Sequence, residues 1–379
     1  MLSGVLGIHV DDGLGGRNDY FAQQVDKLER KFPFGSKKSG QFTYTGIELT
    51  QGSDYSITLS QSQYVRGIKP IAIKHERKPL LTALVTPEER SALRGLIGSL
   101  QYAATNTRPD LACRLSSLQS MVPVATVETL MLANKTLHEA KRHHDVSVVM
   151  EPIPCRDMRF IAFSDASFAS PKAPDSRAGT IILGTHADIE SNHTCPVSPL
   201  CWGSKKIQKV VTSTLAAETM ALNMTMDQLS WIRLCWGWIL DPNCQWQQPA
   251  KALSELPKAV SSVSLPDHSG DAIAATDCKC LYDLISRTAP PNCQEFRTML
   301  HARSIKDMMQ EGTQIKWVHS GAQLADSLTK IMSTEFLRET MRRGVYQLHD
   351  ETEILKQRAC ARSRLQWLRQ KPDQTERES

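Results

Sequence analysis

The sequence predicts an α/β fold in which a mixed sheet with flanking helices occupies the second half of the chain. Two observations lead to this prediction. Apolar runs of strand length recur after about residue 156, and longer stretches with helical periodicity separate them. A proline-containing segment at 151–155 divides them from a first half of different character. The expected strands of the second half are 158–167, 179–186, 200–205, 272–277 and 314–319, and the longest expected helix is 213–240.

The first half is expected to contain short strands followed by helices. An apolar strand at 5–10 runs into two adjacent acids, Asp11 and Asp12. A helix is expected at 18–32, where Asn18 is a suitable N-cap. Two strands should follow at 41–50 and 55–60, around a turn at 51–54. The remaining helices are expected at 60–68, 87–104, 109–120 and 126–143.

Composition limits the class of protein. The chain has 379 residues, of which 41% are hydrophobic, and a length of this order predicts two or three domains with substantial cores. The net charge of +5 permits nucleic-acid binding without demanding it. The ten cysteines include no CxxC pair, which argues against a zinc ribbon. No signal peptide is visible, and the most apolar run, 231–240, is too short to span a bilayer, so we expect a soluble protein of the cytoplasm or nucleus.

Four acids of the second half each lie near the end of an expected element: Asp165, Glu218, Asp277 and Asp326. Any one of them alone is more typical of a structural role. Carboxylates that converge on a sheet edge need cations, because unpaired buried charge is costly. As a set, the four predict a site for two metal ions about 4 Å apart.

Asp11 and Asp12 leave two alternatives open. Asp-Gly is a common turn pair, which indicates a solvated hairpin turn. Two adjacent carboxylates at a strand end are also suited to hold a cation.

Several blocks of the sequence resemble one known family. "FSDASFAS", "LCWGSKKIQKVVTSTLAAETMAL", "ATDCKCLYDLI" and "QIKWVHSGAQLADSLTK" are similar, in order and spacing, to the ribonuclease H domain of Ty1/copia-type retrotransposon Pol polyproteins. Upstream, "GIHVDDGLGG" resembles the palm hairpin of the reverse transcriptase in the same polyprotein. "RSALRGLIGSLQYAATNTRPDLACRLSSLQS" resembles a later block that contains a TRPD element. The resemblance covers roughly residues 4–345.

The resemblance implies a division into four parts. Residues 1–68 would be the end of a reverse-transcriptase palm and the start of its thumb, and 69–155 a helical thumb or connection. Residues 156–345 would form a ribonuclease H-like fold with a mixed five-stranded sheet and flanking helices. Residues 346–379 would be a charged C-terminal tail.

The activity implied by the resemblance is hydrolysis of the RNA strand in RNA–DNA hybrids with two Mg²⁺ ions, which Mn²⁺ can replace. Asp165 would bridge both ions, and Asp326 would complete the ion that activates water. Glu218 and Asp277 would hold the ion at the leaving oxygen. Asp11 and Asp12 would be remnant metal ligands of a polymerase, so DNA synthesis is not expected from this chain alone, and the missing polymerase portion is a candidate partner.

Other residues are assigned with a competing interpretation beside each. Lys205, Lys206 and Lys209 are expected to contact nucleic-acid phosphates, although such a run also occurs as a solvated charged face. His319 is a candidate general acid–base or a plain strand-end histidine.

The chain also departs from the family pattern. His9 stands where an aromatic residue is usual, "TSTLAAET" and "VHS" replace the family's usual strings, and the insert at 241–270 is longer than usual. A catalytically inactive relic, a nucleic-acid-binding fragment and one piece of a full RNA-directed DNA polymerase therefore stay open as alternatives.

Overall fold

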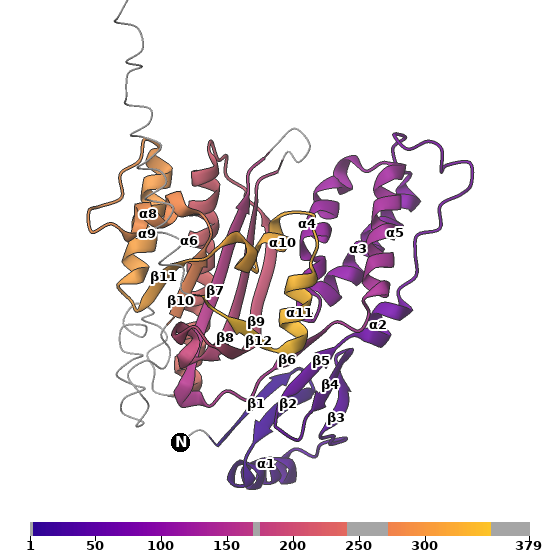
Figure 1. Cartoon of the computed structure of the whole chain (residues 1–379). Helices are drawn as coiled ribbons and strands as arrows, with labels where there is room; N and C mark the ends of the chain where they lie inside the picture. Colours follow the sequence, from indigo (N-terminus) through magenta and orange to yellow (C-terminus); the bar gives the residue numbers. More distant parts are fainter. Residues whose placement is uncertain (1–2, 170–174, 241–271, 350–379) are drawn as a thin grey trace, which may run out of the picture.

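A computed structural model describes residues 3–169, 175–240 and 272–349 of the chain (Figure 1). Its largest sheet has six strands in the order β11-β10-β7-β8-β9-β12. Strands β7, β8, β9 and β12 pair antiparallel, whereas β10 runs parallel to both β7 and β11. The bounds are β7 Met158–Ser167, β8 Arg177–His186, β9 Thr194–Lys206, β10 Ala272–Thr276, β11 Thr313–Trp317 and β12 Val345–Gln347.

Helices cover both faces of this sheet (Figure 1). Along β7, Phe160 and Ala162 pack toward one set of helices, whereas Ile161 and Phe163 pack toward the other, as the alternation of a strand requires. The first face carries α6 (Thr214–Leu240), α8 (Lys279–Ser286) and α9 (Phe296–Met309). The second carries α10 (Asp326–Thr329) and α11 (Glu335–Arg343).

This arrangement confirms the predicted α/β class with a mixed sheet and flanking helices, but the expected count of five strands is wrong for the described residues. The additional strand is β12, which pairs with β9 through Val345↔Pro196 and the two following pairs. The expected insert at 241–270 and almost all of the expected tail at 346–379 lie outside the described residues. None of the described helices is long and apolar enough to cross a membrane.

A helical unit lies beside the sheet, next to β9 and α10 (Figure 1). It consists of α3 (Pro87–Asn106), α4 (Ala112–Met121) and α5 (Val127–Arg142), close to the expected bounds. Its "TRPD" element is structural, because Arg108 forms two hydrogen bonds of 2.8 Å with the Asp110 carboxylate and both side chains are buried. The guanidinium also donates to the Ala140 carbonyl at 3.0 Å, so the element ties the start of α4 to the end of α5.

Polar contacts join the helical unit to the large sheet. Arg177 on β8 donates to the hydroxyl of Ser116 on α4 at 2.5 Å. Trp202 on β9 donates through Nε1 to the carbonyl of Ala104 on α3 at 2.7 Å. Helix α4 is therefore held against the sheet beside α10.

The N-terminal part contains two small sheets, a hairpin and a four-stranded sheet. Strands β1 (Gly4–His9) and β2 (Asp12–Arg17) form the hairpin, and α1 (Asp19–Lys31) follows with Asn18 as its N-cap. The four-stranded sheet has the order β3-β4-β5-β6. Its bounds are β3 Gln41–Tyr44, β4 Ile47–Gln51, β5 Ile57–Ser60 and β6 Ser147–Met150, and α2 is Ser62–Gly67.

The prediction of one strand at 41–50 is wrong. The chain turns at Thr45 and Gly46, which have φ angles of +47° and +79°, and continues as β4 antiparallel to β3. Glycine adopts this left-handed region readily, so the Thr45-Gly46 pair permits a tight turn inside an apolar run.

Candidate active site

Asp165 occupies a buried position near the end of β7. The residue is 1% exposed, and its Cα partner on β8 is Gly179. The hydroxyl of Thr329 on α10 donates a hydrogen bond to Oδ2. Burial raises the pKa of Asp165 to about 6, although the ammonium of Lys330 and the bond from Thr329 oppose the rise.

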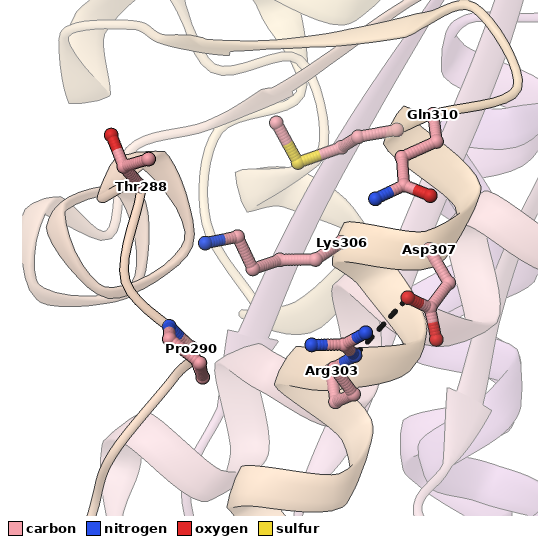
Figure 2. A pocket seen from close by; sticks show the side chains of 7 residues that line it. Thr288, Pro290, Arg303, Lys306, Asp307 and Gln310 are labelled. Atoms are coloured by element: carbon pink, nitrogen blue, oxygen red, sulfur yellow. Dashed lines mark ion pairs between the residues drawn. The ribbon is translucent and has the colours of Figure 1, made fainter.

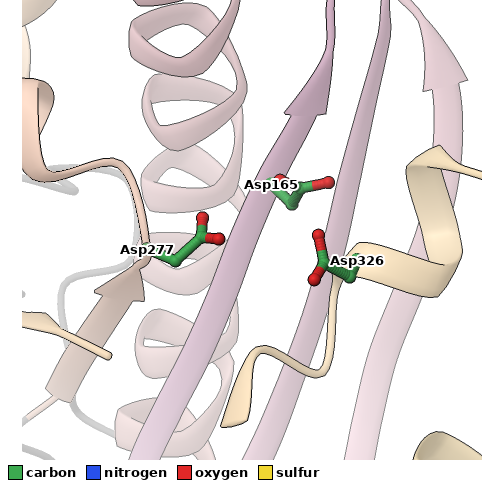
Figure 3. Close-up of side chains that lie close together, drawn as sticks. All are labelled: Asp165, Asp277 and Asp326. Atoms are coloured by element: carbon green, nitrogen blue, oxygen red, sulfur yellow. The ribbon is translucent and has the colours of Figure 1, made fainter. Parts of the chain in front are cut away.

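Asp277 and Asp326 approach Asp165 from two other elements (Figure 3). Asp277 follows the last residue of β10, and Asp326 begins α10. One oxygen of each of the three carboxylates lies within 4.8 Å of the others. In the described ranges, no other group of three or more His, Cys, Asp or Glu side chains comes this close.

Glu218 is the fourth predicted acid, and it comes from the second turn of α6. It is 6% exposed, and its Oε2 is buried with no hydrogen-bond partner. Burial, and after it the nearby charges of Asp165 and Asp277, raise the pKa of Glu218 to about 9. A buried, unpartnered carboxylate oxygen beside two other acids is costly in the absence of a cation.

The donor set fits a hard divalent cation. All of the acidic groups offer carboxylate oxygens, which Mg²⁺ and Mn²⁺ prefer over nitrogen or sulfur ligands. Oε2 of Glu218 is available as a ligand for such a cation, because it is buried and accepts no hydrogen bond. Three of the four predicted acids, Asp165, Asp277 and Asp326, therefore form one group. Glu218 is outside this group, but the charges of Asp165 and Asp277 are near enough to raise its pKa.

Three residues that support the acids were not predicted from the sequence. Ser320 donates through Oγ to Oδ2 of Asp277 at 2.8 Å, and the indole of Trp317 donates to the Asp277 carbonyl at 2.9 Å. Gly179 lets α10 approach the sheet, because a Cβ there would lie 2.7 Å from Cγ2 of Thr329 and 3.0 Å from the carbonyl of Ala325.

Replacing Gly179 with alanine is therefore expected to push α10, and with it Asp326, away from Asp165. Misplacement of about 1 Å can lower a rate by about 10²-fold. For the ribonuclease activity that the sequence resemblance implies, we expect cleavage of RNA–DNA hybrid to fall about 10²-fold while the circular dichroism spectrum is retained. Gly203→Ala on the neighbouring strand is the control, since the methyl group added there would have no atom within 4 Å. Equal activity of the two variants contradicts the proposed role.

The remaining predicted residues lie around the site or apart from it. His319 is exposed, and its Nδ1 accepts a hydrogen bond from the Gly321 N–H at 3.1 Å. It directly precedes Ser320, the residue that contacts Asp277. Asp11 and Asp12 are exposed at the tip of the β1–β2 hairpin, and neither belongs to the group of three acids.

The three predicted lysines do not share one face. Residues that pair across neighbouring strands point to the same face of the sheet, and this face alternates along each strand. One face therefore carries Asp165, Gly179 and Ser204, and also Ser167, Arg177 and Lys206. Lys205 lies between Ser204 and Lys206 on β9. Lys206 thus lies on the face of Asp165, and Lys205 lies on the opposite face. Lys206 also forms an ion pair of 2.6 Å with Asp175, and Lys209 is exposed beyond the end of β9.

A separate pocket lies at α9 and contains none of the four acids (Figure 2). Its volume is about 280 Å³, and Lys306 and the Arg303–Asp307 ion pair form part of its wall. Lys306 donates a hydrogen bond to the carbonyl of Ala289 at 2.9 Å. This bond gives the Lys306 side chain a structural role at the wall of the pocket.

Comparison with known proteins confirms the resemblance to retrotransposon Pol polyproteins. The chain is 26% identical over 245 residues to the retrovirus-related Pol polyprotein from transposon RE1 of Arabidopsis thaliana, and 27% identical over 245 residues to that from transposon RE2 of the same plant. Each alignment covers 59% of this chain and 15% of the relative, so the chain spans about a seventh of the length of these relatives. No family model matches the chain.

Solved structures with low sequence identity are also similar. The foamy viral protease-reverse transcriptase in complex with RNA/DNA hybrid is 11% identical with a TM-score of 0.41, over 87% of this chain and 37% of that one. Ribonuclease H1 from the archaeon Halobacterium salinarum NRC-1 is 12% identical with a TM-score of 0.26, over 45% of this chain and 93% of that one.

Proposed function

We propose that this chain carries a metal-dependent ribonuclease H that hydrolyses the RNA strand of RNA–DNA hybrids, and that residues 156–345 with β12 form the catalytic part. The observation that supports this proposal most directly is the convergence of Asp165, Asp277 and Asp326 to within 4.8 Å, with Glu218 buried beside them. The Pol polyprotein relatives agree with an enzyme of this class.

Asp165, Glu218, Asp277 and Asp326 would hold two divalent cations, Mg²⁺ or Mn²⁺. When bound, such ions supply a nucleophile at neutral pH and neutralise charge on the phosphate. The chain's own residues provide rigid placement: β7 fixes Asp165, the Trp317 and Ser320 bonds fix Asp277, and close packing of α10 on Gly179 fixes Asp326. His319, exposed one residue before Ser320, is positioned to exchange a proton with solvent at the edge of the site.

The direct test is cleavage of a labelled RNA strand in a hybrid by the purified full chain, with Mg²⁺ or Mn²⁺ and with EDTA. Single-stranded RNA and duplex DNA are the substrate controls. We expect metal-dependent cutting of the hybrid alone. If the folded chain binds hybrid but cuts none with either ion, the inactive-relic alternative replaces this proposal.

Phosphate contact by Lys205, Lys206 and Lys209 is part of the proposal and is tested by salt dependence. Each lysine that neutralises a phosphate contributes about 1 unit to the slope of log K against log salt, so replacing all three with alanine flattens the slope by about 2–3 units if all contribute. Because Lys205 and Lys206 face opposite sides of β9, we expect a smaller change for one of the two single variants. A variant with alanine in place of Lys69, Lys74 and Lys78 controls for the change in net charge. If the slope of the Lys205, Lys206 and Lys209 variant is unchanged, these lysines form a solvated charged face and do not contact phosphates.

The N-terminal part is proposed to be related to a reverse transcriptase and to dock on a polymerase segment that covers its exposed hairpin. No residue of 3–40 is buried, and apolar side chains of the hairpin such as Ile8 and Val10 are 70% and 86% exposed. A two-stranded hairpin with open edges is marginal on its own, so a covering partner is expected to stabilise it.

DNA synthesis is not expected from this chain alone. Among the described residues, no third acid joins Asp11 and Asp12 in a group that could hold a metal. We expect no nucleotide incorporation on a primed template with Mg²⁺ or Mn²⁺. Incorporation by the purified chain that Asp12→Asn abolishes contradicts this prediction.

A further inference from the structure

Lys330 places its ammonium group on two of the acids. It ends α10, one turn after Asp326, and its Nζ lies 2.7 Å from Oδ1 of Asp326 and 3.3 Å from Oδ2 of Asp165. The Lys330 side chain is 48% exposed, whereas the side chain of Asp165 is only 2% exposed. The lysine therefore reaches a buried carboxylate from the solvent side.

This contact balances charges that otherwise repel. Three carboxylates within 4.8 Å of one another cost free energy unless a cation lies among them. Among the described residues, Lys330 is the one basic side chain that forms an ion pair with any of the four acids. Asp277 and Glu218 have no such partner in the described part of the chain.

The ammonium contacts two of the three carboxylates that form the candidate metal site. Oδ2 of Asp165 and Oδ1 of Asp326 face Nζ, and both carboxylates belong to the group of three acids. An ammonium and a divalent cation compete for these two carboxylates, because two cations held this close together repel each other. We propose that Lys330 is an internal counter-ion that holds Asp165 and Asp326 together in the metal-free chain and is displaced when a divalent cation binds.

The surroundings of Lys330 allow the exchange. Its backbone N–H donates to the Asp326 carbonyl at 3.1 Å, so the main chain stays in place while the four-carbon side chain moves. About half of the side chain already faces solvent, into which the ammonium can swing. The acids are thereby kept close before the cation arrives, but the cation must compete with Lys330 for them.

This inference rests on the proposed metal site but not on RNA cleavage. Its test is metal binding by the full chain without nucleic acid, measured as free Mn²⁺ by electron paramagnetic resonance and as competition by Mg²⁺. Lys330→Met keeps most of the length of the side chain and removes the charge. We expect this variant to bind Mn²⁺ about tenfold more tightly, because the competing charge-assisted contact is lost. Its melting temperature in EDTA should fall by a few degrees, about the shift for loss of one ion pair.

Two further variants make the result specific. Lys330→Arg keeps the positive charge, so its affinity for Mn²⁺ should stay at or below that of the wild type. Arg303→Met breaks the i,i+4 ion pair of Arg303 with Asp307 on α9, away from the acids, and should leave Mn²⁺ affinity unchanged.

The possible results separate this inference from the proposed function. Equal or weaker Mn²⁺ binding by folded Lys330→Met overturns the counter-ion role even if the wild type cuts hybrid. If Lys330→Met binds Mn²⁺ more tightly but the wild type cuts no hybrid, the counter-ion role of Lys330 is supported and the proposed ribonuclease activity is wrong. If neither chain binds Mn²⁺ or Mg²⁺, both are wrong.

Discussion

Asp165→Asn is expected to abolish the proposed cleavage of RNA–DNA hybrid while the chain stays folded. Asparagine keeps the volume of the side chain but removes the charge of the most buried acid in the group of three, so a cation loses the ligand at the centre of the site. Loss of one preorganised electrostatic group typically lowers a rate by about 10²–10³-fold, and we expect at least that here. The measurement is the initial rate on labelled hybrid with saturating Mg²⁺.

The same variant is expected to respond less to metal in a melting experiment. Binding to the folded state alone raises stability with ligand concentration, so a weakened site gives a smaller shift. Mg²⁺ should therefore raise the melting temperature of the wild type more than that of Asp165→Asn. Asp188→Asn, an exposed acid after the far end of β8, should match the wild type in both measurements. Equal cutting by Asp165→Asn and wild type shows that the site assignment is wrong.

The local sequence pattern predicted most helices and strands of the fold. The strands that it did not predict form by pairing with segments distant in sequence. Helices such as α3 and α6 were expected close to their bounds, because their apolar residues repeat with helical period over many turns. Strands β6 and β12 are only four and three residues long. Each forms because a partner distant in sequence offers an open edge: β5 for β6, and β9 for β12. No local window contains such a partner.

The positions of the four acids followed from the sequence, but their supporting residues did not. An acid at an element end is visible in a sequence, whereas the need for glycine at position 179 arises only where α10 packs on β8. Lys330 had a detectable signal, since a basic residue four positions after Asp326 on a helix lies on the same side. The opposite orientations of Lys205 and Lys206 also followed from strand alternation once β9 was known to extend to Lys206.

Glu218→Gln is expected to stabilise the metal-free chain at alkaline pH and to have no effect at about pH 4 and below. The pKa of Glu218 is raised to about 9 by burial and by the charges of Asp165 and Asp277. A free glutamate titrates at about 4.3, so the folded chain holds a proton that the unfolded chain has lost between these pH values. The contribution of Glu218 to stability is therefore fully present below about pH 4.3 and is lost as pH rises toward 9, by at most about 1.4 kcal/mol per pH unit.

Glutamine imitates the protonated acid and does not titrate, which gives the variant its expected advantage near pH 8. Melting in EDTA from about pH 4 to about pH 9 measures this difference, and parallel curves for the two chains contradict the prediction. Glu190→Gln is the control with the opposite sign. Burial raises the pKa of Glu190, but ion pairs with Lys316 and Arg159 outweigh it and lower the pKa overall, so its charge stabilises the fold at pH 8. Adding Mg²⁺ should remove the alkaline deficit of the wild type, because a cation bound at Glu218 favours the ionised carboxylate that burial alone disfavours.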